Sequence, residues 1–173
     1  TDAGTWHPRR SAGESTTSMI ESAPVIQVLD ESTVHLIAAG EVVDRPVSIV
    51  KELVENAIDA ASSRITVEVS TAHGAISRIR ITDDGVGIPS DQVSIAFLAH
   101  ATSKIRTGDD LLSCRTLGFR GEALASIAAV SYVTMVTKPK ESETAIRFRI
   151  TGGEVVECAE TGAPDGTSIM VEE

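Results

Sequence analysis

Aromatic residues are scarce in this sequence: they make up 3% of its 173 residues, whereas hydrophobic residues as a whole make up 42%. A chain of this length can bury a sizeable core, and with so few aromatics that core must consist of Val, Ile, Leu and Ala. We expect one folded domain over residues 23–173 and no internal repeat. Residues 1–22 are rich in Thr, Ser, Gly, Ala and Glu and predict a disordered leader or a cloning remnant.

Cysteine and histidine are also few. Cys114 and Cys158 form no CxxC pair and no zinc spacing, which favours free, reduced thiols in an intracellular protein. The four histidines are scattered and include no HExxH pair. A metal site built from protein ligands alone is therefore not expected.

Long apolar runs and a secretory signal are absent as well. No run approaches the roughly 20 residues that span a bilayer, so no membrane association is expected. The formal net charge is -10, which argues against strong DNA binding by this domain alone, because phosphate contacts require Lys and Arg.

Two common phosphate-binding signatures are missing. No Gly-Lys dipeptide occurs, which excludes GxxxxGK[ST], and Gly85 and Gly87 lack the third glycine of GxGxxG. A nucleotide site in this chain must therefore use another architecture.

The hydrophobic pattern predicts an α+β fold, with a mixed, largely antiparallel sheet covered by helices on one face. The clearest helix begins near Pro46 and has an apolar stripe with spacings of three and four, formed by Val47, Val50, Leu53, Val54, Ala57, Ile58 and Ala61. Other helices are expected over 33–39, over 91–98 and over 122–129. Ser90 or Asp91 could cap the second of these, which would carry Val93, Ile95, Ala96 and Leu98. Strands are expected over 25–28, 65–69, 79–81, 132–137, 144–150, 154–159 and 167–171, and 65–69 and 79–81 should each have one buried face.

Glu52 and Asn56 lie four residues apart on the clearest helix and therefore share one of its faces. A carboxylate can orient and deprotonate a water, and an amide oxygen can bind Mg²⁺. Spacing alone, however, favours an ordinary solvated helix face.

Asp83 to Gly87 read as a strand end followed by a glycine-rich turn. Asp83 could accept a hydrogen bond from the amino group of a base, and Gly87 could let a ring approach the backbone. Taken alone, the segment is more typical of a plain turn.

Two further segments could contact phosphates. The glycine-rich run before the helix near residue 122 could present N–H groups to an anion or could be a flexible loop. The polar loop from His100 to Lys104 could close over a nucleotide or could simply be exposed.

Taken together and in order, these segments resemble the N-terminal domain of the MutL family, a branch of the GHKL ATPases. The matching stretches are AAGEVVDRP, KELVENAIDA, DDGVGI, HATSKI and LGFRGEALASI, followed by Gly166-Thr167. The resemblance runs from about Val25 to Val171 and implies the two-layer Bergerat fold, with ATP between the sheet and the helices. It also outweighs the ordinary interpretations given above for Glu52, Asn56, Asp83 and Gly87.

The resemblance implies a role for each matching residue. Glu52 would be the general base, Asn56 the Mg²⁺ ligand, and Asp83 the acceptor for the adenine amino group, helped by Thr167 through a water. Gly87 would lie near the base. The residues expected to cover the phosphates are Thr102, Ser103, Gly118, Phe119, Arg120, Gly121, Glu122, Ala123 and Leu124.

As a family member, the chain would be an ATP-driven switch in DNA mismatch repair. A full-length homodimer would work with a MutS-type recognition protein and a downstream nuclease or helicase, and most DNA contacts would lie outside this chain. In a prokaryote it would be cytoplasmic and associated with the nucleoid. A longer chain would supply a lysine to the terminal phosphate, so ATP hydrolysis by this segment alone is expected to be very slow.

Two alternatives stay open. One is a non-catalytic, nucleotide-binding interaction module, and the other is a phosphotransferase of the histidine kinase type. One departure from the family pattern is Asp84, where many members have Asn. A second carboxylate would weaken nucleotide binding if it faced the site, and we expect it to point away.

Overall fold

The computed structural model describes residues 33, 46–102, 117 and 121–172. The strand expected over 25–28, the helix over 33–39 beyond Thr33, and Ser103, Cys114, Gly118, Phe119 and Arg120 lie outside these residues. Thr33 itself is helical.

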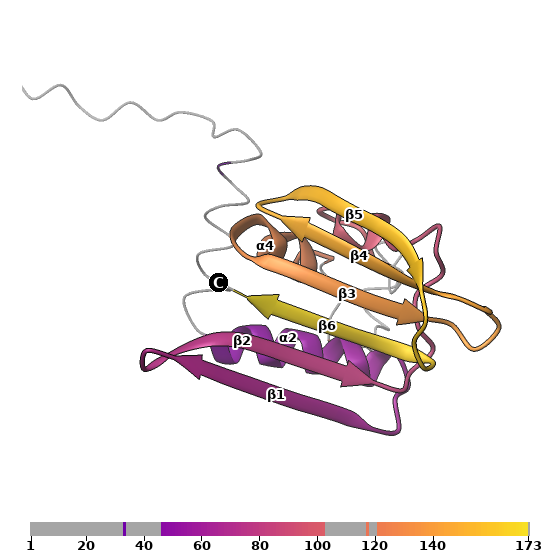
Figure 1. Cartoon of the computed structure of the whole chain (residues 1–173), viewed down its shortest axis with the longest axis horizontal. Helices are drawn as coiled ribbons and strands as arrows, with labels where there is room; N and C mark the ends of the chain where they lie inside the picture. The colour runs from indigo at the N-terminus through magenta and orange to yellow at the C-terminus, as the bar shows by residue number, and fades with distance from the viewer. Residues whose placement is uncertain (1–32, 34–45, 103–116, 118–120, 173) are drawn as a thin grey trace, which may run out of the picture.

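The described chain forms one six-stranded sheet with helices on one side (Figure 1). The strands are β1 (Ile65–Ala72), β2 (Ala75–Asp83), β3 (Tyr132–Lys138), β4 (Ala145–Thr151), β5 (Glu154–Thr161) and β6 (Gly166–Glu172). Their order is β1-β2-β6-β3-β4-β5, and every neighbouring pair is antiparallel. The last strand in sequence therefore lies in the middle of the sheet, between β2 and β3.

Helices α2 (Pro46–Asp59) and α4 (Ala123–Val130) and the short 3₁₀ helix η1 (Ile95–Phe97) complete the layers. Both α-helices lie behind the sheet in Figure 1. The face that they cover is mostly aliphatic, and its buried residues include Ile81, Val133, Ile169 and Val171. The expectation that the core would consist of Val, Ile, Leu and Ala alone is wrong, because Met135, Phe97 and Phe148 are buried in it as well. Phe97 of η1 stacks on Phe148 of β4 with ring centroids 5.1 Å apart.

The stripe predicted for α2 needs one correction. Its buried centre is Ile49, Leu53 and Ala57, whereas the expected members Val47 and Ile58 are exposed. Spacings of four along one helix keep these three residues on one line, and that line faces the sheet.

The helix predicted over 91–98 is wrong. The segment forms turns and the three-residue η1, because several of its amides bond three residues back, including Phe97 to Ser94 and Leu98 to Ile95. Tighter turns bring Phe97 inward and leave Ile95 and Leu98 exposed.

The expectation of one buried face holds for β2 but fails for β1. Ile79 and Ile81 of β2 are buried, while Val67 and Val69 of β1, on the same face, are exposed. β1 is the edge strand, and within the described residues α2 packs mainly over β2. None of the described helices is long and apolar enough to cross a membrane.

Candidate functional site

The site lies at one end of the sheet, where β2 and β3 end and β6 begins. Asp83 closes β2 and pairs in register with Thr167 of β6, which pairs in turn with Thr137 of β3. Asp83 follows Ile79 and Ile81 at strand spacing, so its side chain lies on the helix-covered face. Three polar side chains thus form a row across the end of an otherwise aliphatic layer.

Asp83 is half-buried and well supported. Gly85 N–H donates to its Oδ1 at 2.8 Å. Burial raises the pKa of the Asp83 carboxyl above its ordinary 3.8, and hydrogen bonds from the backbone of Gly85 and Thr167 and from Ser62 oppose that rise. The carboxylate is therefore a strong acceptor in a partly desolvated position.

Asp84 faces the other way. Its carboxylate accepts bonds from Ser63 N (2.7 Å), Ser63 Oγ (2.7 Å) and Arg64 N (2.8 Å). These bonds lower its pKa to about 2. The expectation that Asp84 points away is confirmed: it ties the loop after α2 to the end of β2.

A hydroxyl network extends the row beyond Asp83. Thr137 Oγ1 lies 2.9 Å from Thr167 Oγ1 and accepts the Ile88 N–H at 2.8 Å. Both threonines are buried. Thr137 was not among the predicted site residues, although the alternation along β3 contained the signal: Thr137 is a polar residue that continues the buried series Val133 and Met135.

Gly85 and Gly87 fit closely against neighbouring backbone. A Cβ on Gly85 would lie 2.7 Å from Ala60 O, and one on Gly87, where φ is +71°, would lie 2.5 Å from Lys138 O. The side of Gly87 that would carry a Cβ thus faces the end of β3. Packing within the protein already requires glycine there, whatever the residue does for a ligand.

The C-terminal end of helix α2, which carries Glu52 and Asn56, lies next to the loop after Asp83. Val86 N–H donates to Ala60 O at 3.0 Å, so the helix contacts the loop after Asp83 one turn beyond Asn56. With 1.5 Å of rise per residue, Glu52 lies about 12 Å along the axis from that contact. A ligand held at Asp83 and running along α2 would meet Asn56 first and Glu52 next.

Lys51 lies beside Glu52. Its Nζ is 2.9 Å from Glu55 Oε1 and 3.4 Å from Glu52 Oε1. The hydrogen bond with Glu55 and the charge of Glu52 raise the pKa of Lys51. The side chain of Glu52 keeps 32% of its surface exposed, so water can reach its carboxylate.

The two segments expected near the phosphates meet each other. Gly121, with φ at +64°, packs so closely on Ala101 that a Cβ would lie 2.4 Å from Ala101 O. His100 Nδ1 lies 3.2 Å from Glu122 Oε1. Thr102 is half-buried, and α4 begins at Ala123, followed by Leu124.

The start of the glycine-rich run is also tied to α2. Leu117 N–H donates to Asp59 Oδ1 at 3.1 Å. Asp59 lies one turn beyond Glu55 on the helix. The start of the glycine-rich run therefore lies next to the last residue of α2.

The described residues contain no cluster of three or more His, Cys, Asp or Glu side chains that could hold a metal ion without other ligands. Mg²⁺ in nucleotide sites commonly takes one or two protein oxygens and completes its shell with phosphates and water. An Asn56 amide one helical turn from a water-accessible Glu52 fits that mode.

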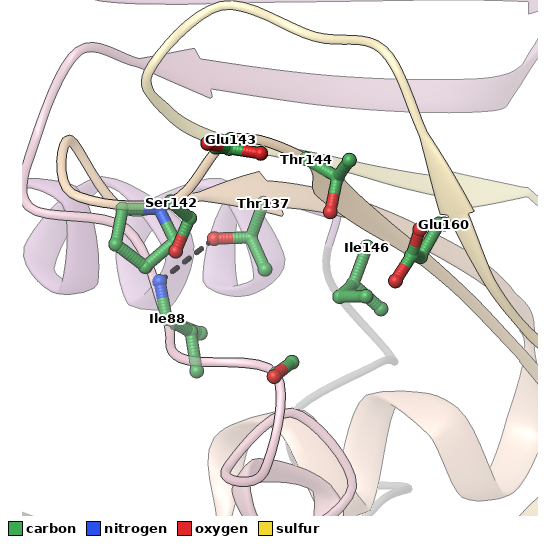
Figure 2. Close-up of a pocket in the computed structure, with 9 residues that line it drawn as sticks. Ile88, Thr137, Ser142, Glu143, Thr144, Ile146 and Glu160 are labelled. Carbon is green, nitrogen blue, oxygen red and sulfur yellow. Dashed lines mark hydrogen bonds between the residues drawn. The ribbon is translucent and has the colours of Figure 1, made fainter.

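A polar pocket of about 230 Å³ lies at the Thr137 end of the row, on the side away from Asp83. Its walls include Ile88, Thr137, Ile146 and Glu160 (Figure 2). Thr137 and Ile88 thus separate this pocket from the Asp83 end of the row.

The decisive comparison is with protein-family models. Residues 45–160 match the model described as Histidine kinase-, DNA gyrase B-, and HSP90-like ATPase. The chain belongs to this ATPase family. The match includes every candidate residue from Glu52 to Leu124 and stops before Thr167.

Curated relatives specify the branch. The chain is 57% identical over 149 residues to the DNA mismatch repair protein MutL of Methanoculleus marisnigri, covering 85% of this chain and 26% of that protein. It is 55% identical over 150 residues to MutL of Agathobacter rectalis, covering 87% and 23%. The chain thus spans about a quarter of the length of these relatives and is a MutL-type module of the ATPase family.

Solved structures agree on the fold. The Aquifex aeolicus MutL ATPase domain complexed with ADP is 26% identical, with a TM-score of 0.53, and the match covers 75% of this chain and 42% of that one. The N-terminal domain of a DNA repair protein is 29% identical, with a TM-score of 0.61, and covers 80% and 38%. The predicted α+β fold of the GHKL type is confirmed, with the refinement that the described sheet is wholly antiparallel.

Proposed function

We propose that this chain binds ATP between the end of β2 and the facing side of α2 and hydrolyses it slowly. The observation that carries the proposal is the acceptor Asp83, half-buried and held by Gly85, at one end of a helix that carries Asn56 and Glu52 in sequence. A MutL-type family membership and an ADP complex of a similar domain support it.

Each residue has a chemical task in this proposal. The Asp83 carboxylate accepts the adenine amino hydrogen, and Thr167 supports the base through a water. Gly87, which has no side chain, lets the loop beside the base pack closely against the end of β3. Glu52 accepts a proton from the water that attacks the terminal phosphorus, and the bond from that phosphorus to the bridging oxygen breaks to give ADP and phosphate.

The phosphates need positive partners and donors. Asn56 would hold Mg²⁺, which would neutralise phosphate charge when bound. Thr102, Ser103 and the segment from Gly118 through Phe119, Arg120, Gly121, Glu122 and Ala123 to Leu124 would cover the phosphates, chiefly with backbone N–H groups. The adjacency of Ala101 and Gly121 favours their acting as one cover.

In the longer protein, ATP binding would order this cover and pair two N-terminal domains, so that the homodimer licenses or releases a MutS-type protein and a downstream nuclease or helicase. With a net charge of -10, the chain would leave most DNA contacts to other regions. A nucleoid-associated, cytoplasmic location in a prokaryote belongs to the same proposal. The isolated chain should bind ATP weakly and turn over very slowly.

The test is thermal stabilisation by ATP and Mg²⁺ in matched variants. Asp83→Asn should lose the stabilisation, because the Gly85 N–H would hold the amide oxygen and leave the NH₂ group facing the adenine amino group. Asp84→Asn should keep the stabilisation, because Asp84 bonds Ser63 and Arg64 instead. Equal stabilisation of both variants would refute the proposed site.

The alternatives predict other results. A histidine-kinase-type phosphotransferase would leave labelled phosphate on protein, whereas the proposed ATPase releases it to solvent. A non-catalytic interaction module would bind ATP but would release no phosphate above background, with or without the Glu52 carboxylate.

A further inference from the structure

His100 has a backbone conformation that residues with side chains seldom adopt. Its φ is +62°, in the left-handed region. It follows the turns of η1, where Ala101 N–H donates to Leu98 O at 3.2 Å. With this backbone, the imidazole of His100 reaches the residue before α4, and its Nδ1 lies 3.2 Å from Glu122 Oε1. A rare conformation that ends in a specific contact points to a function for that contact.

The two segments also touch through their backbones. Gly121 has φ at +64°, and a Cβ there would lie 2.4 Å from Ala101 O. His100 therefore lies against Glu122 at one position, and Ala101 lies against Gly121 at the next. The backbone contact sets the spacing of the two segments, so the side-chain pair chiefly determines where the Glu122 carboxylate lies.

Glu122 immediately precedes α4, but its side chain does not cap the helix. The helical bonds begin with Ser126 N–H, which donates to Glu122 O at 2.9 Å. The N–H groups of residues 123–125 therefore have no acceptor within the helix. Such N–H groups and the helix dipole attract a nearby carboxylate. The Glu122 side chain would turn toward them if no other group held it.

Two of these three residues, Ala123 and Leu124, belong to the proposed cover of the ATP phosphates. A Glu122 carboxylate on their N–H groups would occupy donors that the phosphates need and would repel the phosphate charge. In the structure the carboxylate contacts His100 instead. The position of this one carboxylate thus determines whether the start of α4 is open to an anion.

We propose that His100 holds the Glu122 carboxylate away from the start of α4 and so leaves the first N–H groups of the helix to the ATP phosphates. His100 is a positioning residue, because it acts through Glu122 and does not touch the nucleotide. The inference rests on the proposed function and deepens it.

The charge of His100 strengthens this hold. A neutral imidazole can donate one hydrogen bond to a carboxylate, and an imidazolium adds the opposite charge. Among the described residues, Glu122 is the ionisable group that contacts His100, and the neighbouring helices η1 (Ile-Ala-Phe) and α4 (Ala123–Val130) contain no ionisable residue. The hold should therefore be stronger in mildly acidic than in mildly basic solution.

The experiment measures ATP affinity with Mg²⁺ by calorimetry in the wild-type chain, in His100→Asn, in Glu122→Gln and in the double variant. Asparagine tolerates the left-handed backbone and cannot become a cation. His73→Asn is the matched control, because His73 is an exposed histidine with a similar φ of +52° in the turn between β1 and β2.

The side chains of the pair are exposed to 77% and 42%, so a modest effect is expected. His100→Asn should weaken ATP binding by about three- to fivefold near neutral pH. The double variant should regain the affinity of Glu122→Gln, because no carboxylate is left to compete, and His73→Asn should bind as the wild-type chain does. The ratio of wild-type to His100→Asn affinity should be larger at about pH 6 than at about pH 8, and taking the ratio removes the titration of the nucleotide itself.

A folded His100→Asn protein with wild-type ATP affinity overturns the inference. So does an equal loss on replacing His100 in the wild-type and Glu122→Gln backgrounds, which is what a purely structural role of His100 gives. A ratio that stays constant between the two pH values overturns it as well, since the charge of His100 would then play no part.

If His100→Asn does not fold, Glu122→Gln alone provides the test. The ratio of its ATP affinity to that of His73→Asn should rise from about pH 6 to about pH 8, and a constant ratio would overturn the inference. A wild-type chain that binds no ATP overturns the proposed function itself, whereas ATP binding that does not respond to His100 overturns only the role of His100.

Discussion

The base end and the phosphate end of the proposed site are built differently. At the base end, Asp83, Thr167 and Thr137 stand on three paired strands, and their positions follow from the register of the sheet. At the phosphate end, the described residues come from one helix face and from segments that meet through backbone, as Ala101 and Gly121 do. Side chains fixed at the ends of paired strands suit recognition of a flat, invariant group. A cover made of backbone suits phosphates, which need N–H donors more than particular side chains.

The largest expected effect is a loss of ATP hydrolysis when Glu52, at the phosphate end, is replaced. Glu52→Gln should slow ATP hydrolysis about a hundred- to ten-thousandfold, because an amide cannot take a proton from water, while ATP affinity stays within about twofold. Single-turnover phosphate release measures it. Glu55→Gln, which alters the neighbouring partner of Lys51, is the control and should hydrolyse at nearly the wild-type rate; equal losses would remove Glu52 from its role.

The second prediction separates packing from backbone strain in the loop after Asp83. Gly87→Ala should reduce the free energy of unfolding by about 3 kcal/mol, since it combines a positive φ with a Cβ 2.5 Å from Lys138 O. Gly74→Ala has a similar φ of +84° and nothing within 4 Å, so about 1 kcal/mol is expected. Urea unfolding compares the two, and equal values would mean that the loop does not pack on β3 as described.

The third prediction uses acid to test the base end. Because the pKa of Asp83 is raised by burial, its carboxylate should gain a proton at a pH above its ordinary value of 3.8. ATP affinity should therefore fall as pH is lowered toward that raised pKa, before an ordinary carboxyl titrates. Calorimetry measures the affinity in the wild-type chain and in Asp84→Asn, which should keep both ATP binding and this pH dependence. An affinity that does not fall until the pH is below 3.8 would assign the effect to an ordinary carboxyl and not to Asp83.

The smallest effect concerns Asp84, whose pKa is lowered to about 2. A lowered pKa gives stability that is present above the unfolded value of 3.8 and is lost as pH falls toward 2. Asp84→Ala should flatten the acid dependence of unfolding in that window, and Asp84→Asn should be the milder change, because its amide oxygen can still accept from Ser63 and Arg64. An unchanged acid profile in Asp84→Ala would show that the three bonds contribute nothing.

The strands and the two main helices could be predicted from the sequence because their signals are local. Alternating Ile79 and Ile81 mark the buried face of β2, and spacings of three and four mark α2. The helix prediction for residues 91–98 was wrong because a few apolar residues at helical spacing do not distinguish an α-helix from successive tighter turns. The exposure of Val67 depends on how far α2 extends over the sheet, which no local pattern contains.

The proposed site could be assembled from motifs, but its supports could not. Asp83 and Thr167 are 84 positions apart in sequence, and only the placement of β6 beside β2 makes them neighbours. Thr137 and the Lys138–Asp165 pair depend on the same central position of β6. Asp84 could be predicted to turn away, yet its partners Ser63 and Arg64 emerge only from the folded loop.

The most direct test of the account is a crystal structure of the chain with Mg²⁺ and a non-hydrolysable ATP analogue. In the proposed site, the adenine amino group lies within hydrogen-bond distance of the Asp83 carboxylate. The phosphates run along α2, past Asn56 and toward Glu52. Adenine in the pocket beside Ile146 and Glu160, or phosphates at Asp83, would contradict it.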